Sequence, residues 1–319
     1  MSTTISSSIT ESSSVQHLVT LFDVNREDVV EILRIARVLK DAFQEGERRP
    51  YLPGRVLGLL FQKPSLRTRV SFECGITHLG GQSLFLGQDV GWGNREVIAD
   101  FAQVLSQYVD IIVCRAHAHE RVTELAAFSA CPVINGLTDV AHPSQALADL
   151  FTVQEAFGSL SGVTVTYVGD GNNVAASLAL CCALLDVELR IATPPGYELS
   201  DSFVEKVRQH AGDAKIYATN DAIEGATGAD VIYTDVWTSM GQEAEEEARK
   251  RDFANYQVNA NLMSHANADA KFLHCLPARR GEEVTGEVID GPGSLVVQQA
   301  ANRMHAQKGL LAWLLKAEV

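Results

Sequence analysis

Residues 63–69 read Lys-Pro-Ser-Leu-Arg-Thr-Arg, and they separate two stretches of different periodicity. The apolar run 56–61 before them is typical of a buried strand. The segment after them has apolar residues at helical spacing and ends at the glycines 80–81. Ser65 therefore stands where the N-cap of a helix is expected.

A helix that begins at Ser65 would present free backbone N–H groups and a partial positive charge to an anion. Arg67 and Arg69 add full charges, and a guanidinium can hold a phosphate with two parallel hydrogen bonds. Ser65 and Thr68 add hydroxyl groups. The stretch predicts a phosphate site without a glycine-rich Walker loop. The alternative is an ordinary capped helix with two surface arginines.

The bulk composition limits the class of protein. The chain has 319 residues, enough for two domains with a core each. Hydrophobic residues make up 46% and charged residues 21%, as is usual for soluble globular proteins. The formal net charge of −14 argues against non-specific binding of nucleic acid, which requires a basic face. An anion site must then be a local positive pocket on an acidic molecule.

The sequence gives no sign of a membrane span or an export signal. No apolar stretch reaches the roughly 18 residues that a span needs. The first 14 residues are rich in Ser and Thr and lack Lys and Arg, so we expect a disordered tail over 1–14. The six cysteines form no Cys-x-x-Cys pair or zinc-ligand pattern. We therefore expect reduced thiols, no metal site and a cytoplasmic protein.

Strand-like and helix-like patterns alternate along both halves of the chain. Strands are expected at 56–61, 83–86, 110–114, 133–134, 163–168, 188–192, 216–218, 231–234 and 272–275. Helices are expected near 28–43, after Ser65, and near 98–108, 143–157, 174–185, 201–210, 221–226, 259–266 and 298–315. The alternation predicts an α/β fold of two domains, each a mostly parallel sheet flanked by helices. The glycines at 158 and 162 suggest a domain junction nearby.

Polar side chains follow the C-terminal ends of these strands, where open parallel sheets bind ligands. In the first half they are Arg67, Arg115 and the run 142–145, His-Pro-Ser-Gln. In the second half they are the runs 170–173, 235–241 and 274–278. These strand ends are the expected ligand site.

Most of these segments also have a plainer interpretation. His142 could cap the following helix, and Cys275 could be a core thiol. Residues 169–173 read Gly-Asp-Gly-Asn-Asn, but Val174 stands near the place of the third glycine of a dinucleotide loop, so NAD is only weakly indicated. The acidic run 242–252 is expected to be a solvated helix or lid. Asp235 is more informative, because a carboxylate at a strand end needs a cationic partner.

Taken together, four motifs resemble the aspartate/ornithine carbamoyltransferase superfamily, and its ornithine branch most closely. They are Ser65-Leu66-Arg67-Thr68-Arg69, His142-Pro143-Ser144-Gln145, Asp235-Val236-Trp237-Thr238-Ser239-Met240-Gly241 and His274-Cys275-Leu276-Pro277-Ala278. The resemblance runs from about Leu18 to Leu315, and it is specific because all four motifs occur in this order.

The resemblance implies transfer of the carbamoyl group from carbamoyl phosphate to the δ-amine of L-ornithine, which gives L-citrulline and phosphate in arginine metabolism. It implies no cofactor and a homotrimer or a multiple of trimers. It implies that residues 15–150 bind carbamoyl phosphate and residues 151–297 bind ornithine. The C-terminal helix 298–315 would pack back on the first domain and complete it.

The resemblance also implies the site residues. Those for carbamoyl phosphate are Ser65, Leu66 (through its backbone), Arg67, Thr68, Arg115, His142, Gln145, Cys275, Leu276 and Arg303. Those for ornithine are Asn173, Asp235, Ser239 and Met240. The catalytic residues would be Arg115, His142 and Cys275. The loop 87–96 is shorter than is common in the family, and Gln88 is the candidate for the glutamine that reaches a neighbouring subunit.

Three rival functions remain open at this point. Aspartate carbamoyltransferase would share the phosphate motif, but its second domain should carry arginines for a dicarboxylate in place of Asp235. The branches for acetylornithine, succinylornithine and putrescine fit less well, since Asp235, Ser239 and Met240 suit a free α-amino acid. A noncatalytic paralogue that only binds carbamoyl phosphate is disfavoured by the presence of Arg67, His142 and Cys275.

Overall fold

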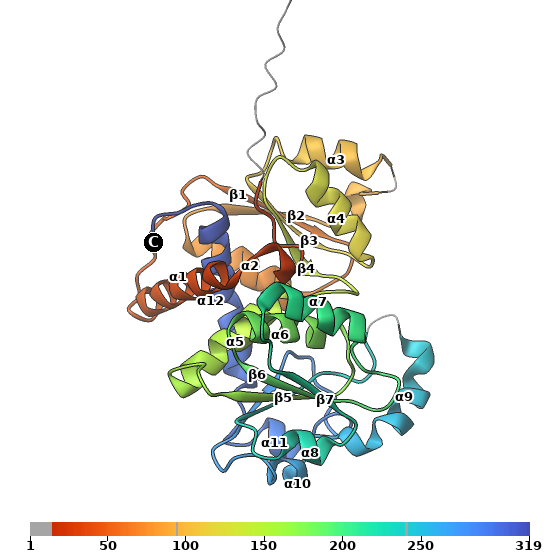
Figure 1. The fold of residues 1–319 in the computed structure, drawn as a ribbon. Coiled ribbons are helices and arrows are strands. Elements are labelled where there is room, and N and C mark those ends of the chain that lie inside the picture. The colour runs from red at the N-terminus through yellow and green to blue at the C-terminus, as the bar shows by residue number, and fades with distance from the viewer. Residues whose placement is uncertain (1–14, 94, 240–241) are drawn as a thin grey trace, which may run out of the picture.

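The protein forms two α/β domains, one above the other in Figure 1, in a computed structural model that describes residues 15–93, 95–239 and 242–319. Each domain contains one parallel sheet with helices against it. The expected fold class is confirmed. The tail expected at 1–14 lies outside the described residues.

The first sheet has the strand order β2-β1-β3-β4. Its strands are β1 (Val56–Phe61), β2 (Gln82–Leu86), β3 (Ile111–Arg115) and β4 (Val133–Leu137). Every position of β3 is buried and β1 is nearly so, which accounts for their unbroken apolar sequences. The helices of this domain are α1 (Arg26–Gln44), α2 (Leu66–His78), α3 (Ile98–Leu105) and α4 (His119–Phe128), with short 3₁₀ turns η1 (Leu21–Asp23) and η2 (Gln88–Val90).

Helix α4 was not among the expected helices. It buries only Val122, Leu125 and Ala126, so its apolar face covers little more than one turn. A stripe this short gives a weak periodic signal.

The second sheet has the strand order β7-β6-β5-β8-β9. Its strands are β5 (Thr164–Val168), β6 (Glu188–Ala192), β7 (Ile216–Thr219), β8 (Val231–Thr234) and β9 (Lys271–His274). Its helices are α6 (Asn173–Leu184), α7 (Asp201–Ala211), α8 (Ala222–Ala226), α9 (Glu246–Asp252), α10 (Ala260–Met263) and α11 (Gly286–Ile289), with 3₁₀ turns η3 (Glu243–Glu245) and η4 (Ala254–Tyr256). All strand pairs in both sheets are parallel, so each sheet presents the carboxyl ends of its strands on one side.

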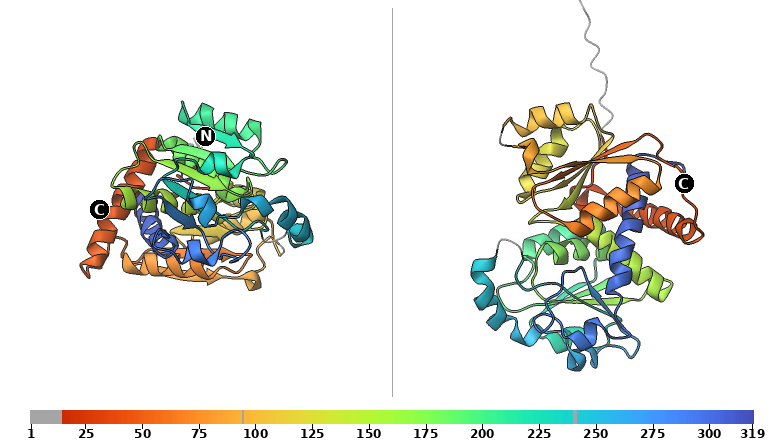
Figure 2. Two further views of the ribbon diagram at one scale, coloured as in Figure 1. Left: turned by 90° about the horizontal axis from the view of Figure 1, so that it is seen from below. Right: turned by 180° about the vertical axis from the view of Figure 1, so that it is seen from behind.

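Two long helices connect the domains. Helix α5 (Pro143–Phe157) packs against α6, and the division expected between residues 150 and 151 falls inside α5 and stays a prediction. Helix α12 (Val296–Leu314) packs against α1, α2 and α5, as expected for the C-terminal helix. Figure 2 shows from behind how α12, in blue, runs from the second domain to the helices of the first.

The contact between α1 and α12 depends on Gly309. A Cβ atom at this position would lie 2.5 Å from the carbonyl oxygen of Ile32 and 2.9 Å from Ala36. Only glycine lets the two backbones approach this closely. None of the helices in the described parts of the chain is both long enough and apolar enough to span a membrane.

Candidate active site

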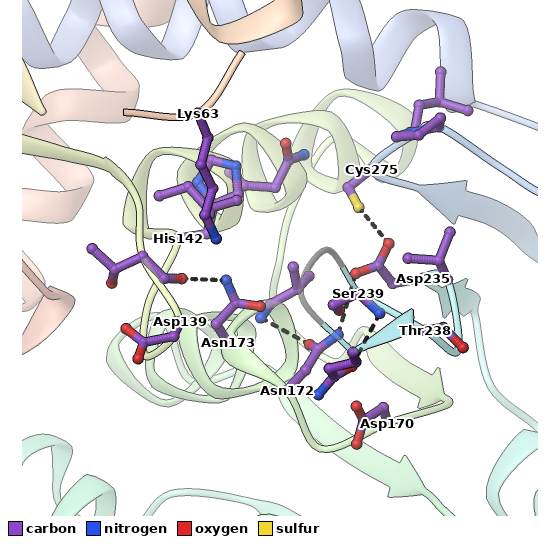
Figure 3. A pocket seen from close by; sticks show the side chains of 18 of the residues that line it. Lys63, Asp139, His142, Asp170, Asn172, Asn173, Asp235, Thr238, Ser239 and Cys275 are labelled. Carbon is purple, nitrogen blue, oxygen red and sulfur yellow. Dashed lines mark hydrogen bonds between the residues drawn. The ribbon is translucent and has the colours of Figure 1, made fainter. Parts of the chain in front are cut away.

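A cavity of about 1010 Å³ lies between the two domains and is lined by residues that follow the carboxyl ends of strands in both sheets. Figure 3 shows its walls, with Lys63 and His142 from the first domain across from Asn172, Asp235 and Cys275 of the second. The sequence placed its candidate residues at these strand ends. The fold brings the candidate residues of both domains together because the carboxyl ends of the strands in both sheets face the same cavity.

The N-terminus of α2 forms one end of the cavity. Ser65 is the N-cap of this helix, and its Oγ accepts a hydrogen bond of 3.3 Å from the backbone N–H of Thr68. The hydroxyls of Ser65 and Thr68 are also 2.9 Å apart, and Nη2 of Arg303 donates a hydrogen bond of 2.8 Å to Oγ1 of Thr68. Leu66 is 76% exposed, so its side chain contributes little to this end of the cavity.

Three guanidinium groups surround this helix start. Arg115 and Arg303 are buried, and burial together with neighbouring cations lowers the pKa of each to about 10. For Arg115 these cations are Arg303 and Arg67. The Nε–H groups of Arg115 and Arg303 are buried without a hydrogen-bond partner among the described residues. Buried like charges with unused donors are unfavourable unless an anion joins them, so this end of the cavity is suited to an anionic ligand.

His142 and Gln145 lie next to the guanidinium cluster at the start of α5. His142 occupies the N-cap position of α5, as the plain interpretation expected, but its side chain makes no capping hydrogen bond. Burial, and then the charges of Arg303 and Arg115, hold the pKa of His142 well below its usual value. The imidazole is therefore neutral at physiological pH. Its Nδ1 and the Oε1 of Gln145 are both buried without partners among the residues described.

The opposite end of the cavity is acidic. Asp170 and Asp235 follow β5 and β8, and Asp139 and Glu198 also line the cavity. The thiol of Cys275 donates a hydrogen bond of 3.0 Å to Oδ1 of Asp235. Burial and then the charge of Asp235 raise the pKa of Cys275 well above its usual value, so the group remains a thiol. The acidic end suits a cationic ligand.

Two asparagines at the start of α6 contact both walls of the cavity, one in each domain. Asn172 caps this helix, and its Nδ2 donates a 3.3 Å hydrogen bond to Oδ2 of Asp235. Nδ2 of Asn173 donates to the backbone carbonyl of Thr138 at 2.6 Å, which bridges the domains and leaves Oδ1 as the group that can accept from a ligand (Figure 3). The preceding Gly171 packs on backbone, because a Cβ atom there would lie 2.6 Å from atoms of Tyr197 and Leu199. The glycine pattern at 169–173 thus serves loop packing.

The expected charged segment at 242–252 contains a residue that sequence reasoning missed. Its helix α9 was anticipated, but Arg249 is buried and donates to Oδ2 of Asp170 at 2.7 Å and to the carbonyl of Trp237 at 3.0 Å. It therefore supports the backbone of the loop that carries Ser239. The expectation of a wholly solvated segment is wrong for Arg249. The basic residues 249–251, Arg-Lys-Arg, at the end of an acidic run were the available signal, but nothing in the run marks Arg249 as the buried one.

His274 is held in place by its neighbours. Its Nδ1 accepts from the backbone N–H of Leu276 at 2.9 Å, so Nε2 carries the proton and faces the buried carboxylate of Glu283 at 3.2 Å. Ligand atoms of Asp235, His274 and Cys275 lie within 4.8 Å of one another. Because both ring nitrogens of His274 are occupied, this group is better suited to hydrogen bonding than to holding a metal.

The cavity collects nearly all of the residues that the sequence singled out. Those that line it are Ser65, Leu66, Arg67, Thr68, Arg115, His142, Gln145, Asn173, Asp235, Ser239, Cys275, Leu276 and Arg303. Met240 lies outside the described residues. Gln88 is not in the lining, and its Nε2 donates to the carbonyl of Gln62.

Two family models cover most of the chain. The model described as aspartate/ornithine carbamoyltransferase, carbamoyl-P binding domain, matches residues 16–155. The model described as aspartate/ornithine carbamoyltransferase, Asp/Orn binding domain, matches residues 161–314. The two matches meet near the end of α5.

Relatives with known names are similar over almost the whole chain. The ornithine carbamoyltransferase of Bacillus subtilis is 52% identical over 301 residues, which is 93% of either chain. The solved structure of ornithine carbamoyltransferase from Pyrococcus furiosus has a TM-score of 0.92 at 46% identity and covers 97% of this chain and all of its own. The anabolic ornithine carbamoyltransferase from Campylobacter jejuni has a TM-score of 0.87 at 37% identity, with 94% and 98% covered.

Proposed function

The chain belongs to the aspartate/ornithine carbamoyltransferase family, and we propose that its cavity transfers the carbamoyl group of carbamoyl phosphate to the δ-amine of L-ornithine, giving L-citrulline and phosphate. One observation carries this proposal. Three guanidinium groups and a helix N-terminus lie at one end of a cavity whose other end carries Asp235. A dianionic donor and a cationic acceptor can therefore bind side by side.

Carbamoyl phosphate binds at the α2 end. Its phosphate accepts hydrogen bonds from the free N–H groups and hydroxyls at residues 65–68 and from the guanidinium groups of Arg67 and Arg303. Arg303 brings α12 to the ligand, and its contact with Thr68 holds it in position beforehand. The carbamoyl group lies near Arg115, His142 and Gln145, with Cys275 and Leu276 on its other side.

The reaction needs no proton transfer to or from His142. The neutral δ-amine of ornithine attacks the carbamoyl carbon, and negative charge grows on the carbonyl oxygen. Arg115, Thr68 and a ring N–H of the neutral His142 are donors for this oxygen. Removing one donor of this kind typically costs about 10²–10³ in rate. The guanidinium groups then stabilise the phosphate as it leaves, and the departing phosphate takes up the proton that the attacking nitrogen loses. Binding both substrates in one cavity turns a bimolecular step into a positioned one.

Ornithine binds at the acidic end. Asp235 faces its α-ammonium group, and Oδ1 of Asn173 accepts from the same group. Ser239 and Met240 hold the α-carboxylate. Arg249 donates to the carbonyl of Trp237, two residues before Ser239, and so supports the loop that carries Ser239.

A chemical assay with competing acceptors tests this function. Purified protein is incubated with carbamoyl phosphate and either L-ornithine or L-aspartate, and the carbamoylated products are identified by mass spectrometry. We expect citrulline from ornithine and no carbamoyl-aspartate. Carbamoyl-aspartate as the main product would assign the chain to the aspartate branch, and no product with either acceptor would support a paralogue that only binds.

We further propose a cytoplasmic homotrimer, or a multiple of trimers, that acts in arginine biosynthesis. Helix α2 and the edge strand β2 expose Leu66, Val70, Leu84 and Phe85, and apolar surface of this kind is usually covered by another chain. A relative from Pyrococcus furiosus is named as anabolic, which supports the biosynthetic direction. Light scattering of the purified protein tests the oligomer, since a monomer would contradict a trimer.

A further inference from the structure

A carboxylate with no role in the proposed reaction lies directly behind the carbamoyl end of the cavity. Asp149 on α5 is fully buried and does not line the cavity. It accepts hydrogen bonds from three elements: Nε2 of Gln145 on α5 at 2.7 Å, Nε2 of Gln299 on α12 at 2.7 Å, and the hydroxyl of Tyr233 on β8 at 3.0 Å. Gln145 and Gln299 share the same oxygen, Oδ1.

The direction of these hydrogen bonds is fixed by a backbone group. The N–H of His274 donates to Oε1 of Gln299 at 2.9 Å. A backbone N–H can only donate, so the oxygen of Gln299 must face His274 and its NH₂ group must face Asp149. Oδ1 of Asp149 is consequently an acceptor in this arrangement.

Gln145 is then left with one favourable orientation. If its side-chain amide turned over, Oε1 would lie against Oδ1 of Asp149 with no proton between the two oxygens. The NH₂ group therefore stays on Asp149, and Oε1 points away from it. This oxygen is buried, has no partner among the described residues, and belongs to a residue that lines the cavity. A buried acceptor without a partner selects a ligand that can donate to it.

We propose that Asp149 and Gln299 are positioning residues that hold the amide of Gln145 as a hydrogen-bond acceptor for the –NH₂ of the carbamoyl group. This inference rests on the proposed function and deepens it. The site recognises a phosphorylated amide and rejects a compound of the same shape that carries an oxygen acceptor in place of the –NH₂. Selectivity for the amide depends on the polarity of a hydrogen-bond chain that starts at the backbone of His274.

Two stable probes test whether the site prefers an –NH₂ group to an oxygen acceptor at this place. Phosphonoacetamide carries the –NH₂ group, and phosphonoacetate carries a carboxylate oxygen at the same place. Calorimetry gives the dissociation constant of each probe, and the ratio of the two constants cancels effects that act on both. Phosphonoacetate also carries one more negative charge than phosphonoacetamide, so the double variant is compared with Asp149→Asn, which has lost the same charge from the protein. The ratio is measured for the unaltered protein and for Asp149→Asn, Gln299→Met and the double variant.

The proposal predicts a non-additive result. In Gln299→Met, the carboxylate of Asp149 still forces the NH₂ of Gln145 toward it. In Asp149→Asn, the NH₂ group of Gln299 still needs an acceptor, so the new asparagine keeps its oxygen in the place of Oδ1. Gln145 donates to that same oxygen, so its orientation is unchanged. Only the double variant lets both amides turn over. We expect the ratio to stay within about twofold in Gln299→Met, and to shift about tenfold toward phosphonoacetate between Asp149→Asn and the double variant, as one relocated hydrogen bond allows.

Each outcome decides the matter. An unchanged ratio in the folded double variant overturns the proposal. A shift of about tenfold in Gln299→Met also overturns it. If circular dichroism shows that the double variant does not fold, Asp149→Leu takes its place, because it lacks the same charge and leaves no acceptor for the NH₂ of Gln145, and it should show the same tenfold shift relative to Asp149→Asn. The Gln145→Leu variant is the control: it should lose the preference for phosphonoacetamide. If Gln145→Leu keeps that preference, the contact between Gln145 and the carbamoyl group is itself wrong. If the unaltered protein binds neither probe, the proposed function fails as a whole.

Discussion

Nη2 of Arg303 lies 2.8 Å from Oγ1 of Thr68, although 235 residues separate the two in the chain. Thr68 belongs to the first turn of α2 and Arg303 to the middle of α12. This contact joins the C-terminal helix to the helix start that holds the anion site. It places a buried guanidinium beside the N-terminus of α2, in the wall of the cavity.

Arg67 should be a strong determinant of carbamoyl phosphate binding. The Arg67→Ala variant removes a guanidinium from the cluster, and we expect binding to weaken by roughly 2–5 kcal/mol. Calorimetry with phosphonoacetamide gives this value. Arg69→Ala is the matched control, since Arg69 is exposed and engaged with Glu73 at 3.1 Å and with the ring of Phe85. Equal losses in the two variants would contradict a specific role for Arg67.

Asp235 should act on ornithine alone. Asp235→Asn removes the negative charge that faces the α-ammonium group, and losing one charge-assisted hydrogen bond should raise KM for ornithine about 10–100-fold. Steady-state citrulline formation measures this change. The affinity for phosphonoacetamide serves as the internal control and should hold. An unaltered KM for ornithine would remove Asp235 from the acceptor site.

The pH profile should reflect the substrate amine. A δ-amine with a pKa near 10, as in lysine, is mostly protonated at neutral pH and must lose its proton before it attacks. The pKa of His142 is held well below its usual value, so this side chain is neutral across the pH range of the assay. Its titration therefore does not contribute to the pH profile of kcat/KM. We expect kcat/KM for ornithine to rise steadily from about pH 6 to about pH 9. A flat profile would speak against rate-limiting attack by the neutral amine.

Asp149 should leave a signature in the pH dependence of stability. Burial raises its pKa from 3.8 to about 6, although its hydrogen bonds and Arg303 oppose the shift. Between these values the folded state holds a proton that the unfolded state has lost. The contribution of Asp149 to the free energy of unfolding is therefore present below about pH 4 and is lost as pH rises through about 6, a change of about 3 kcal/mol.

Urea unfolding of the unaltered protein and of Asp149→Asn at one protein concentration checks this. The stability difference between them should move in favour of Asp149→Asn as pH rises through the window from about 4 to about 6. If the two curves stay parallel, Asp149 does not titrate as described.

The regular elements were largely predictable from the sequence. The strands β1, β6 and β8 and the helix α5 have the limits expected for them. Apolar runs in β1 and β8, alternating apolar residues in β6 and a Pro at the start of α5 are strong local signals. The N-cap at Ser65 is also a local signal, and the structure confirms it. Short elements such as α4 and α11 were missed, since their buried faces are too small to produce a periodic pattern.

The site was predictable in part. Residues at strand ends could be found from motifs, but the partners that orient them come from distant segments. Asp149 looks like one more polar position inside a helix, and its link to Gln299 spans 150 residues. Arg249 lies in an acidic run whose composition suggests solvent, yet it is buried against Asp170. Such pairs depend on the packing of α5, α9 and α12, which no local pattern specifies.

We propose that one cavity holds both substrates, with the phosphate on the first domain and the amino acid on the second. A crystal structure with N-δ-(phosphonoacetyl)-L-ornithine, which joins mimics of the two substrates, tests it most directly. We expect the phosphonate on Ser65, Thr68 and Arg303, and the α-ammonium group on Asp235. An empty cavity in a crystal that binds the compound elsewhere, or a compound bound with its ends reversed, would show that the two substrates do not bind as proposed.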